Sequence, residues 1–110
     1  MISEEILPNS VIVHIDRFSI SKDLQLEALE EFKELCLSSG TSVCAEVSGK
    51  VDRPTPNFFI KQGKLDEINQ LVKTYKANLV IFNNDLTPSQ ERNLEKYLGT
   101  RVLDRTSLIL

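Results

Sequence analysis

Short apolar, β-branched runs alternate along the chain with longer segments in which apolar residues recur every three or four positions. Four runs predict strands: 11–16, 41–51, 79–82 and 101–104. Three amphipathic segments predict helices: 21–40, 65–75 and 88–99. Strands that alternate with helices favour right-handed crossovers and a parallel sheet. The pattern therefore predicts an α/β fold in the order β-α-β-α-β-α-β, a small, doubly wound, parallel four-stranded sheet with helices on both faces.

Cap residues mark the ends of the predicted helices. Ser21 precedes the first helix and Gly40 follows it, in positions that favour an N-cap and a left-handed terminal residue. Thr87 and Gln90 stand at capping-box spacing, with Pro88 at the first helical position between them. The third helix is therefore predicted to begin at Pro88.

The length of 110 residues suits one domain, and a content of 41% apolar and 26% charged residues is typical of a globular protein. We expect a flexible N-terminal arm over 1–10 and the α/β domain over 11–105. Residues 106–110 are expected to start a following, truncated segment, because Thr106 resembles a cap residue before apolar residues. No targeting segment and no membrane span is evident, so the expected location is the cytoplasm.

The chain has one His and two Cys, which leave little for imidazole or thiol chemistry. Cys36 and Cys44 are too few to form a metal site by themselves, and His14 lies in the middle of a predicted strand. A Ser-His-Asp or Cys-His arrangement cannot be assembled with confidence from a single His. We therefore interpret all three as packing residues and expect no catalytic residue in this chain.

Ligands of open parallel sheets bind beyond the carboxyl ends of the strands. These positions carry five polar residues: Asp16, Asn83, Asn84, Asp85 and Asp104. The carboxylates of Asp16, Asp85 and Asp104 could hold Mg²⁺ together, which would indicate a nucleotide- or phosphate-binding site. The alternative is that Asn and Asp form turns and caps after the strands.

The loop between Lys50 and Lys64 is basic, although the chain as a whole is acidic. It carries four cations and one carboxylate, a local charge of +3 in a chain of net charge −3: Lys50, Arg53, Lys61 and Lys64 against Asp52. The net charge argues against a protein that coats nucleic acid, but the loop is a local basic patch. Phe58 and Phe59 lie within it, where rings could stack on exposed RNA bases. Alternatively, one Phe fills the core and the cations are solvated.

Gly63-Lys64 does not belong to a phosphate-binding P-loop. Such a loop needs Gly at position 58 and Ser or Thr at position 65, where this chain has Phe58 and Leu65. We interpret Gly63 as a turn residue that leads into the second helix, whose N-terminus can still attract a phosphate.

Several ordered segments carry a family resemblance. They are Arg53-Pro54-x-Pro56, Phe59-Ile60-x-x-Gly63-Lys64, the stretch 79–95 and the stretch 102–110. Together they resemble the amino-terminal domain of the HflX family of ribosome-associated GTPases, and the opening stretch 11–16 resembles that of bacterial members. One departure is Lys61, because the family usually reads Gly-x-Gly-Lys at 61–64. The change removes a glycine and adds a cation that suits an RNA backbone.

The resemblance implies that this chain is a fragment of a longer GTPase with a helical hairpin and a G domain. GTP and Mg²⁺ would be cofactors of that G domain, whereas the fragment itself would hold no cofactor and hydrolyse nothing. The resemblance also implies binding to the large ribosomal subunit and its rRNA, and splitting or rescue of stalled ribosomes under stress. Family members have further been associated with an adenine nucleotide outside the G domain.

Three functional hypotheses follow. The first is a regulatory, RNA-contacting module whose contacts are Lys50, Arg53, Phe58, Lys61 and Lys64. Contacts with a phosphate or with the G domain are expected at Gly63, Asn84, Asp85, Ser89, Gln90, Asn93 and Arg105. The second is the magnesium-dependent site at the carboxyl ends of the strands, and the third is a domain that docks on the G domain and restrains its hydrolysis.

Overall fold

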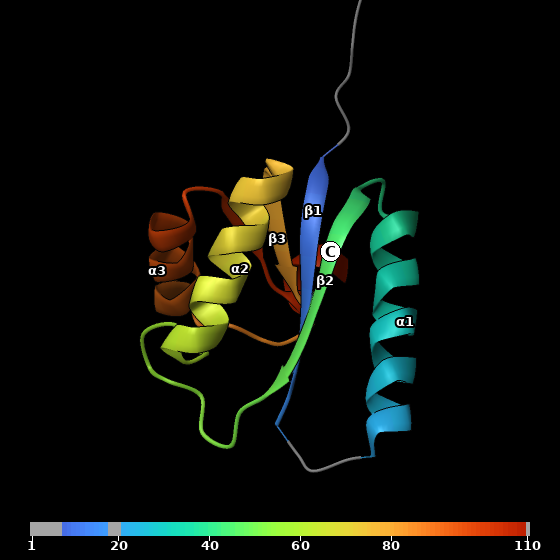
Figure 1. The fold of residues 1–110 in the computed structure, drawn as a ribbon, viewed down its shortest axis with the longest axis horizontal. Helices are drawn as coiled ribbons and strands as arrows, with labels where there is room; N and C mark the ends of the chain where they lie inside the picture. Colours follow the sequence, from blue (N-terminus) through green and yellow to red (C-terminus); the bar gives the residue numbers. More distant parts are fainter. Residues whose placement is uncertain (1–7, 18–20, 110) are drawn as a thin grey trace, which may run out of the picture.

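The computed structural model describes residues 8–17 and 21–109 and contains a four-stranded sheet with four helices (Figure 1). The elements are β1 (Asn9–Asp16), α1 (Lys22–Ser38), β2 (Ser42–Lys50), α2 (Gln62–Tyr75), β3 (Leu79–Phe82), α3 (Pro88–Leu98), β4 (Arg101–Leu103) and α4 (Arg105–Ile109). All neighbouring strands are parallel, in the order β2-β1-β3-β4. The predicted α/β fold is therefore confirmed.

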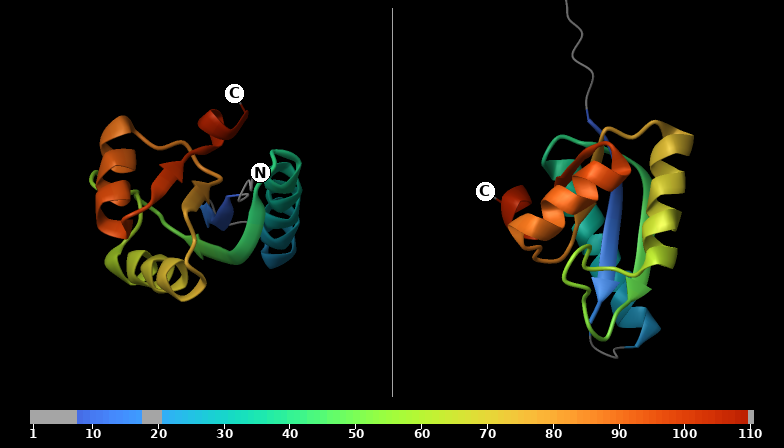
Figure 2. Two further views of the ribbon diagram at one scale, coloured as in Figure 1. Left: turned by 90° about the horizontal axis from the view of Figure 1, so that it is seen from above. Right: turned by 90° about the vertical axis from the view of Figure 1, so that its left-hand side faces the viewer.

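Each face of the sheet buries its own apolar cluster, because side chains alternate along a strand. On β1, Val11 and Val13 pack beneath α2 and α3, whereas Ile12 packs with Phe32 and Cys36 of α1. The views in Figure 2 agree, with α2 and α3 on one side of the sheet and α1 and α4 on the other. Helices on both faces make the arrangement doubly wound, as the sequence predicts.

The chain reverses direction across the sheet between β1 and β3. After β1 it crosses to β2 on one side, and after β3 it crosses to β4 on the other side. The carboxyl ends of β1 and β3 therefore form a topological switch point, where doubly wound folds leave a crevice for a ligand.

The domain begins two residues before the predicted boundary. Asn9 and Ser10 were expected in a flexible arm, but β1 starts at Asn9. Ser10 is fully buried, and its hydroxyl donates to the backbone oxygen of Ser42 at 2.9 Å. The rest of the predicted arm, residues 1–7, lies outside the described residues.

The C-terminal end of the described residues forms a helix that the sequence did not predict. A helix, α4, begins at Arg105, and Leu108 packs partly buried against the α1-side cluster. The residue that caps this helix is Asp104, since its Oδ1 accepts from the backbone N–H of Ser107 at 2.9 Å. Thr106, predicted as the cap, lies inside the helix, and Leu110 lies outside the described residues.

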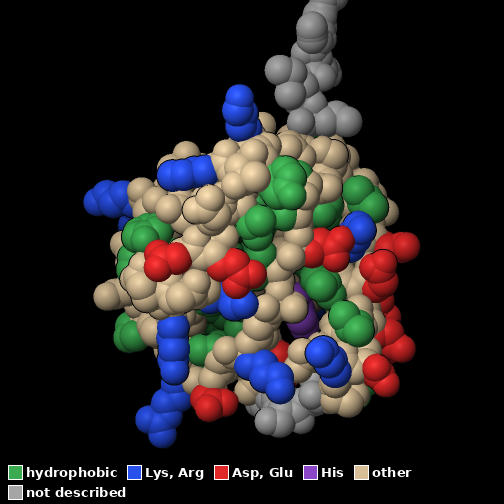
Figure 3. Space-filling view, viewed as in Figure 1, with side chains coloured by type: hydrophobic (Ala, Val, Ile, Leu, Met, Phe, Trp, Pro, Cys, Tyr) green, Lys and Arg blue, Asp and Glu red, His purple; other side chains and the backbone are tan. Residues whose placement is uncertain are grey.

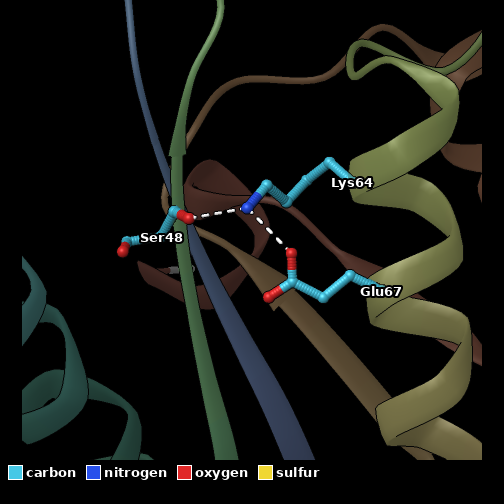
Figure 4. Close-up of polar contacts among 3 residues, drawn as sticks. All are labelled: Ser48, Lys64 and Glu67. Carbon is cyan, nitrogen blue, oxygen red and sulfur yellow. Dashed lines mark hydrogen bonds and ion pairs between the residues drawn. The ribbon is translucent and has the colours of Figure 1, made fainter.

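A side chain covers a backbone group on each outer strand of the sheet. On β2, the Lys64 ammonium donates to the Ser48 oxygen at 2.9 Å (Figure 4). On β4, Oε2 of Glu95 accepts from the backbone N–H of Val102 at 3.0 Å. Unpaired edge groups are sites at which another strand can add, so both contacts protect the sheet. None of the helices in the described part of the chain is long and apolar enough for a membrane crossing.

Candidate functional site

The basic loop, defined as residues 50–64, is fastened to the domain at several points. Its centre closes on itself, because Thr55 and Phe59 exchange backbone hydrogen bonds of 3.2 and 3.0 Å. Nε2 of Gln90 in α3 donates to the Thr55 oxygen at 2.8 Å, and Nδ2 of Asn93 donates to the Asn57 oxygen at 3.0 Å. Gln90 and Asn93, expected to contact a phosphate or the G domain, thus hold the basic loop against α3.

The two aromatic rings of the loop anchor it. Phe59 is 4% exposed, adopts a left-handed φ of 69° and meets Phe82 of β3 edge-on at 6.4 Å. Phe58 is half-buried and lies edge-on against Tyr97 at 5.9 Å. The interpretation that one Phe fills the core is confirmed for Phe59, whereas Phe58, predicted to contact RNA, packs against Tyr97 of α3 and stays partly exposed.

Three of the four cations of the basic loop are exposed: Lys50, Arg53 and Lys61. Among residues 8–17 and 21–109, ion pairs are formed by other side chains, Lys33 with Glu46 and Lys64 with Glu67. The three exposed cations have no ion-pair partner among the described residues, so an external anion can reach them.

Lys64 is different from the other three cations. Its ammonium donates to the Ser48 oxygen and to Oε1 of Glu67, both at 2.9 Å (Figure 4). The side chain crosses β2 over Gly49, where an added Cβ would lie only 2.8 Å from Cε of Lys64. Lys64 thus fastens α2 to the sheet edge, and the structure gives its charge a partner within the domain.

The N-terminus of α2 has no side-chain cap, because Lys61 occupies the cap position without forming a cap hydrogen bond. The sequence predicted Gly63 in a turn before this helix, but Gly63 lies in the first turn of the helix itself. A Cβ there would meet nothing within 4 Å, and its φ is not left-handed. The position is open to solvent.

The carboxylates predicted as magnesium ligands are used within the fold. Oδ2 of Asp104 accepts from the Leu86 N–H at 3.2 Å, and Oδ1 caps α4. Asp85 accepts from the Thr106 hydroxyl at 3.0 Å, and Asp16 accepts from Nε2 of Gln25 at 3.2 Å.

No group of three His, Cys, Asp or Glu side chains suited to a metal ion occurs within the described residues. Burial alone would raise the pKa of Asp104, but hydrogen bonds from the N–H groups of Ser107 and Leu86 outweigh it and lower that pKa. These contacts favour the turn-and-cap interpretation.

Two adjoining cavities lie at the switch point, and both are lined by Asn83 and Arg105. The first, of 380 Å³, lies on the α1 side, and His14, Ala28, Glu31, Phe32 and Leu35 complete its wall. The second, of 230 Å³, is completed by Arg17, Phe59, Asn84 and Asp85. Asn84 itself is committed to the fold, because its amide group bonds both backbone groups of Ile15, at 3.1 and 2.8 Å. Ser89, another predicted contact, is exposed in the first turn of α3.

His14, interpreted from the sequence as a packing residue, lines the first cavity. Its Nδ1 lies 3.0 Å from Nδ2 of Asn83, while its buried Nε2 has no hydrogen-bond partner within the described residues. Sequence analysis missed His14 and Arg17 as site residues, although strand alternation places His14 on the same face as Ile12 and Asp16, at the carboxyl end of β1.

The comparisons with known proteins first define a class. The family model described as "GTP-binding GTPase N-terminal" matches residues 26–110. Solved structures agree on the fold. The crystal structure of the SsGBP and GDP complex matches with a TM-score of 0.65 and 20% sequence identity. The match covers 92% of this chain and 27% of the SsGBP chain. A GTP-binding protein from Sulfolobus solfataricus in complex with GDP has a TM-score of 0.62 and 21% identity over 94% of this chain and 29% of its own. The chain is thus of the class formed by N-terminal domains of GTP-binding GTPases.

The particular family is HflX, to which the chain belongs. GTPase HflX of Escherichia coli K12 is 41% identical over 101 residues, which are 92% of this chain and 23% of that protein. GTPase HflX of Thermococcus kodakarensis is 45% identical over 80 residues, which are 73% of this chain and 18% of that protein. The chain thus spans about a fifth of the length of its curated relatives, and the predicted family is confirmed.

Proposed function

We propose that this domain is the regulatory and ribosome-contacting N-terminal part of an HflX-type GTPase. The full protein binds the large ribosomal subunit in the cytoplasm and splits or rescues stalled ribosomes under stress. GTP and Mg²⁺ are held by its G domain, which hydrolyses the GTP, while the domain described above contacts rRNA and the G domain.

The basic loop is the observation that supports an rRNA contact. Lys50, Arg53 and Lys61 project from a loop that Gln90 and Asn93 hold against α3. A backbone ordered before binding loses less conformational entropy when it meets a ligand. Cations that neutralise phosphates release counterions, which gives an affinity that falls as salt rises.

The test uses the full-length GTPase and purified large ribosomal subunits. Replacing the three exposed cations together, Lys50→Gln, Arg53→Gln and Lys61→Gln, removes the charge but keeps much of each stem. Affinity measured across a salt series should fall, and the slope of log affinity against log salt should flatten by about 2 for three lost phosphate contacts.

The matched control removes three charges from the opposite edge of the domain, where α2 and α3 end. Lys73→Gln, Lys76→Gln and Lys96→Gln change the net charge equally. This variant should keep the wild-type salt slope. An unchanged slope in the basic-loop variant, or equal flattening in both variants, would reject the rRNA contact at this loop.

A further inference from the structure

The crevice at the switch point offers a site that the basic loop does not use. Its main cavity of 380 Å³ is of the size that encloses small ligands, and its entrance adjoins the second cavity through Asn83 and Arg105. Figure 3 shows the single histidine, in purple, within a hollow of this face, with Lys and Arg side chains in blue along the edge below it.

We propose that this crevice takes up one unpaired nucleotide of the RNA that the basic loop contacts, with its base in the main cavity and its phosphate at Arg17 and Arg105. The proposal rests on the proposed rRNA contact, but it concerns different residues and a different kind of contact.

His14 supplies the most specific observation. With the Asn83 amide nitrogen facing Nδ1, that ring nitrogen accepts, and the proton is carried by Nε2. Burial lowers the pKa of His14, the charge of Asp16 opposes this shift and that of Arg105 adds to it, so the ring is neutral near pH 7. A buried N–H without an acceptor is costly, and an acceptor on a bound base would satisfy it.

The remaining polar groups favour a base over a simple anion. Arg105 donates hydrogen bonds, whereas the carboxylate of Glu31 on the same wall accepts them and repels an anion. The edge of a nucleobase carries donors and acceptors side by side and so matches both groups. The flat faces of the base would lie against the apolar part of the wall, formed by Ala28, Phe32 and Leu35.

The end of β1 brings the start of the basic loop close to the crevice. Lys50 pairs in register with Asp16 across β1 and β2, and Arg17 follows directly. Arg17 and Arg105 both line the second cavity, where two cations outnumber the one lining carboxylate, Asp85. An RNA strand whose phosphates follow Lys50 therefore passes the mouth of the crevice, where an unpaired base can turn inward.

The test uses two variants of the full-length GTPase, with its G domain saturated by GDP. Ala28→Leu fills the cavity, and His14→Phe removes the N–H donor with little change of shape. A matched control, Ser38→Leu, adds a leucine to an exposed position of the same helix. Thermal melts establish that each variant is folded, and the two cavity variants serve as replacements for each other if one is not.

Affinity for large ribosomal subunits should fall about tenfold in both cavity variants, the effect of losing one stacked and hydrogen-bonded base. The salt slope should stay at the wild-type value, because Arg17 and Arg105 are unchanged and keep the phosphate at the mouth of the crevice when the base is excluded. The basic-loop variant should flatten the slope instead, so failure of the rRNA contact and failure of the crevice are separate results. The Ser38→Leu control should bind as the wild type does.

Two outcomes would overturn the proposal. The first is wild-type affinity for the subunits in a folded cavity variant. The second is found by titrating UMP and AMP into the same proteins: binding that Ala28→Leu abolishes, without any change in subunit affinity, would assign the crevice to a free nucleotide.

Discussion

Asp104 shows how a single carboxylate can join three parts of this chain. It follows β4, its Oδ2 accepts from the Leu86 N–H in the loop after β3, and its Oδ1 caps α4 through the Ser107 N–H. The side chain is well buried, and both donors are backbone N–H groups. A residue type that suits magnesium in the sequence is therefore a structural acceptor in the fold.

Replacement of this carboxylate gives the prediction at the residue scale. Asp104→Ala removes a helix cap and leaves the buried Leu86 N–H without its acceptor, so the free energy of unfolding should fall by about 2 kcal/mol. Asp104→Asn keeps one carbonyl oxygen and should lose less. Urea unfolding at pH 7 measures both, and equal stability of the alanine variant and the wild type would contradict the assignment.

The same residue sets a dependence on pH. Its pKa is lowered in the folded domain, so the unfolded chain binds the proton more readily and the stabilisation is present at neutral pH. It is lost as pH falls below about 4, through the lowered folded-state pKa. The difference in unfolding free energy between wild type and Asp104→Ala should accordingly shrink when the measurements are extended to pH 3.

Residue types were easier to predict than the roles of the residues. The cations at 50, 53 and 61 are exposed as expected. The Lys64 ammonium instead donates to the Ser48 oxygen and to the carboxylate of Glu67. That contact depends on α2 packing beside β2, a relation that spacing along the chain does not contain. His14 was missed for a similar reason, because the cavity beside it forms only when α1 and the end of β3 come together.

At the scale of single elements, α3 was predicted most accurately. Thr87 and Gln90 form the capping box, with the Gln90 N–H donating to the Thr87 hydroxyl oxygen at 3.1 Å and the Thr87 N–H donating to Oε1 at 2.9 Å. Both bonds join residues three positions apart, so the local sequence is enough to predict them. The five-residue α4 was missed, since its cap lies at the end of a strand and the helix has little more than one turn.

Substitutions at the two residues of the capping box distinguish the helix cap from the attachment of the basic loop to α3. Thr87→Ala removes only the cap and should lower the free energy of unfolding by about 1 kcal/mol. Gln90→Ala also removes the amide that donates to the Thr55 oxygen, so amide exchange at Phe59, which bonds Thr55, should quicken in this variant. Equal Phe59 exchange in the two variants would show that Gln90 does not hold the loop.

On the scale of the whole molecule, the domain has three layers, because the sheet lies between α2 and α3 on one face and α1 and α4 on the other, and the candidate site lies at the carboxyl edge of the sheet. The carboxyl edge carries the end of β1, the crevice and the start of the basic loop, while α2 and α3 end at the opposite edge. The order of the four strands and the first three helices was predictable, because short apolar runs alternate in the sequence with amphipathic segments of helical period. The grouping of Arg17, Arg105 and His14 at this edge arises only from the strand order β2-β1-β3-β4.

The regulatory part of the proposed function concerns this whole unit. If the domain docks on the G domain and restrains hydrolysis, removing residues 1–110 from the full-length GTPase should raise the rate of GTP turnover in the absence of ribosomes. The measurement is single-turnover GTP hydrolysis by the intact and the shortened protein, and equal rates would reject a restraining role. Adding the separate domain, residues 1–110, to the shortened protein should lower its rate of GTP turnover again.

The contacts on the outer strands matter most before the rest of the protein exists. An N-terminal domain leaves the ribosome first and waits while the remaining chain is made, beside identical nascent chains on the same messenger. Lys64 on the Ser48 oxygen and Glu95 on the Val102 N–H each occupy one edge group on which a neighbouring copy could otherwise build a strand. Each outer strand of this domain therefore carries one covered backbone group that opposes strand addition while the chain is being made.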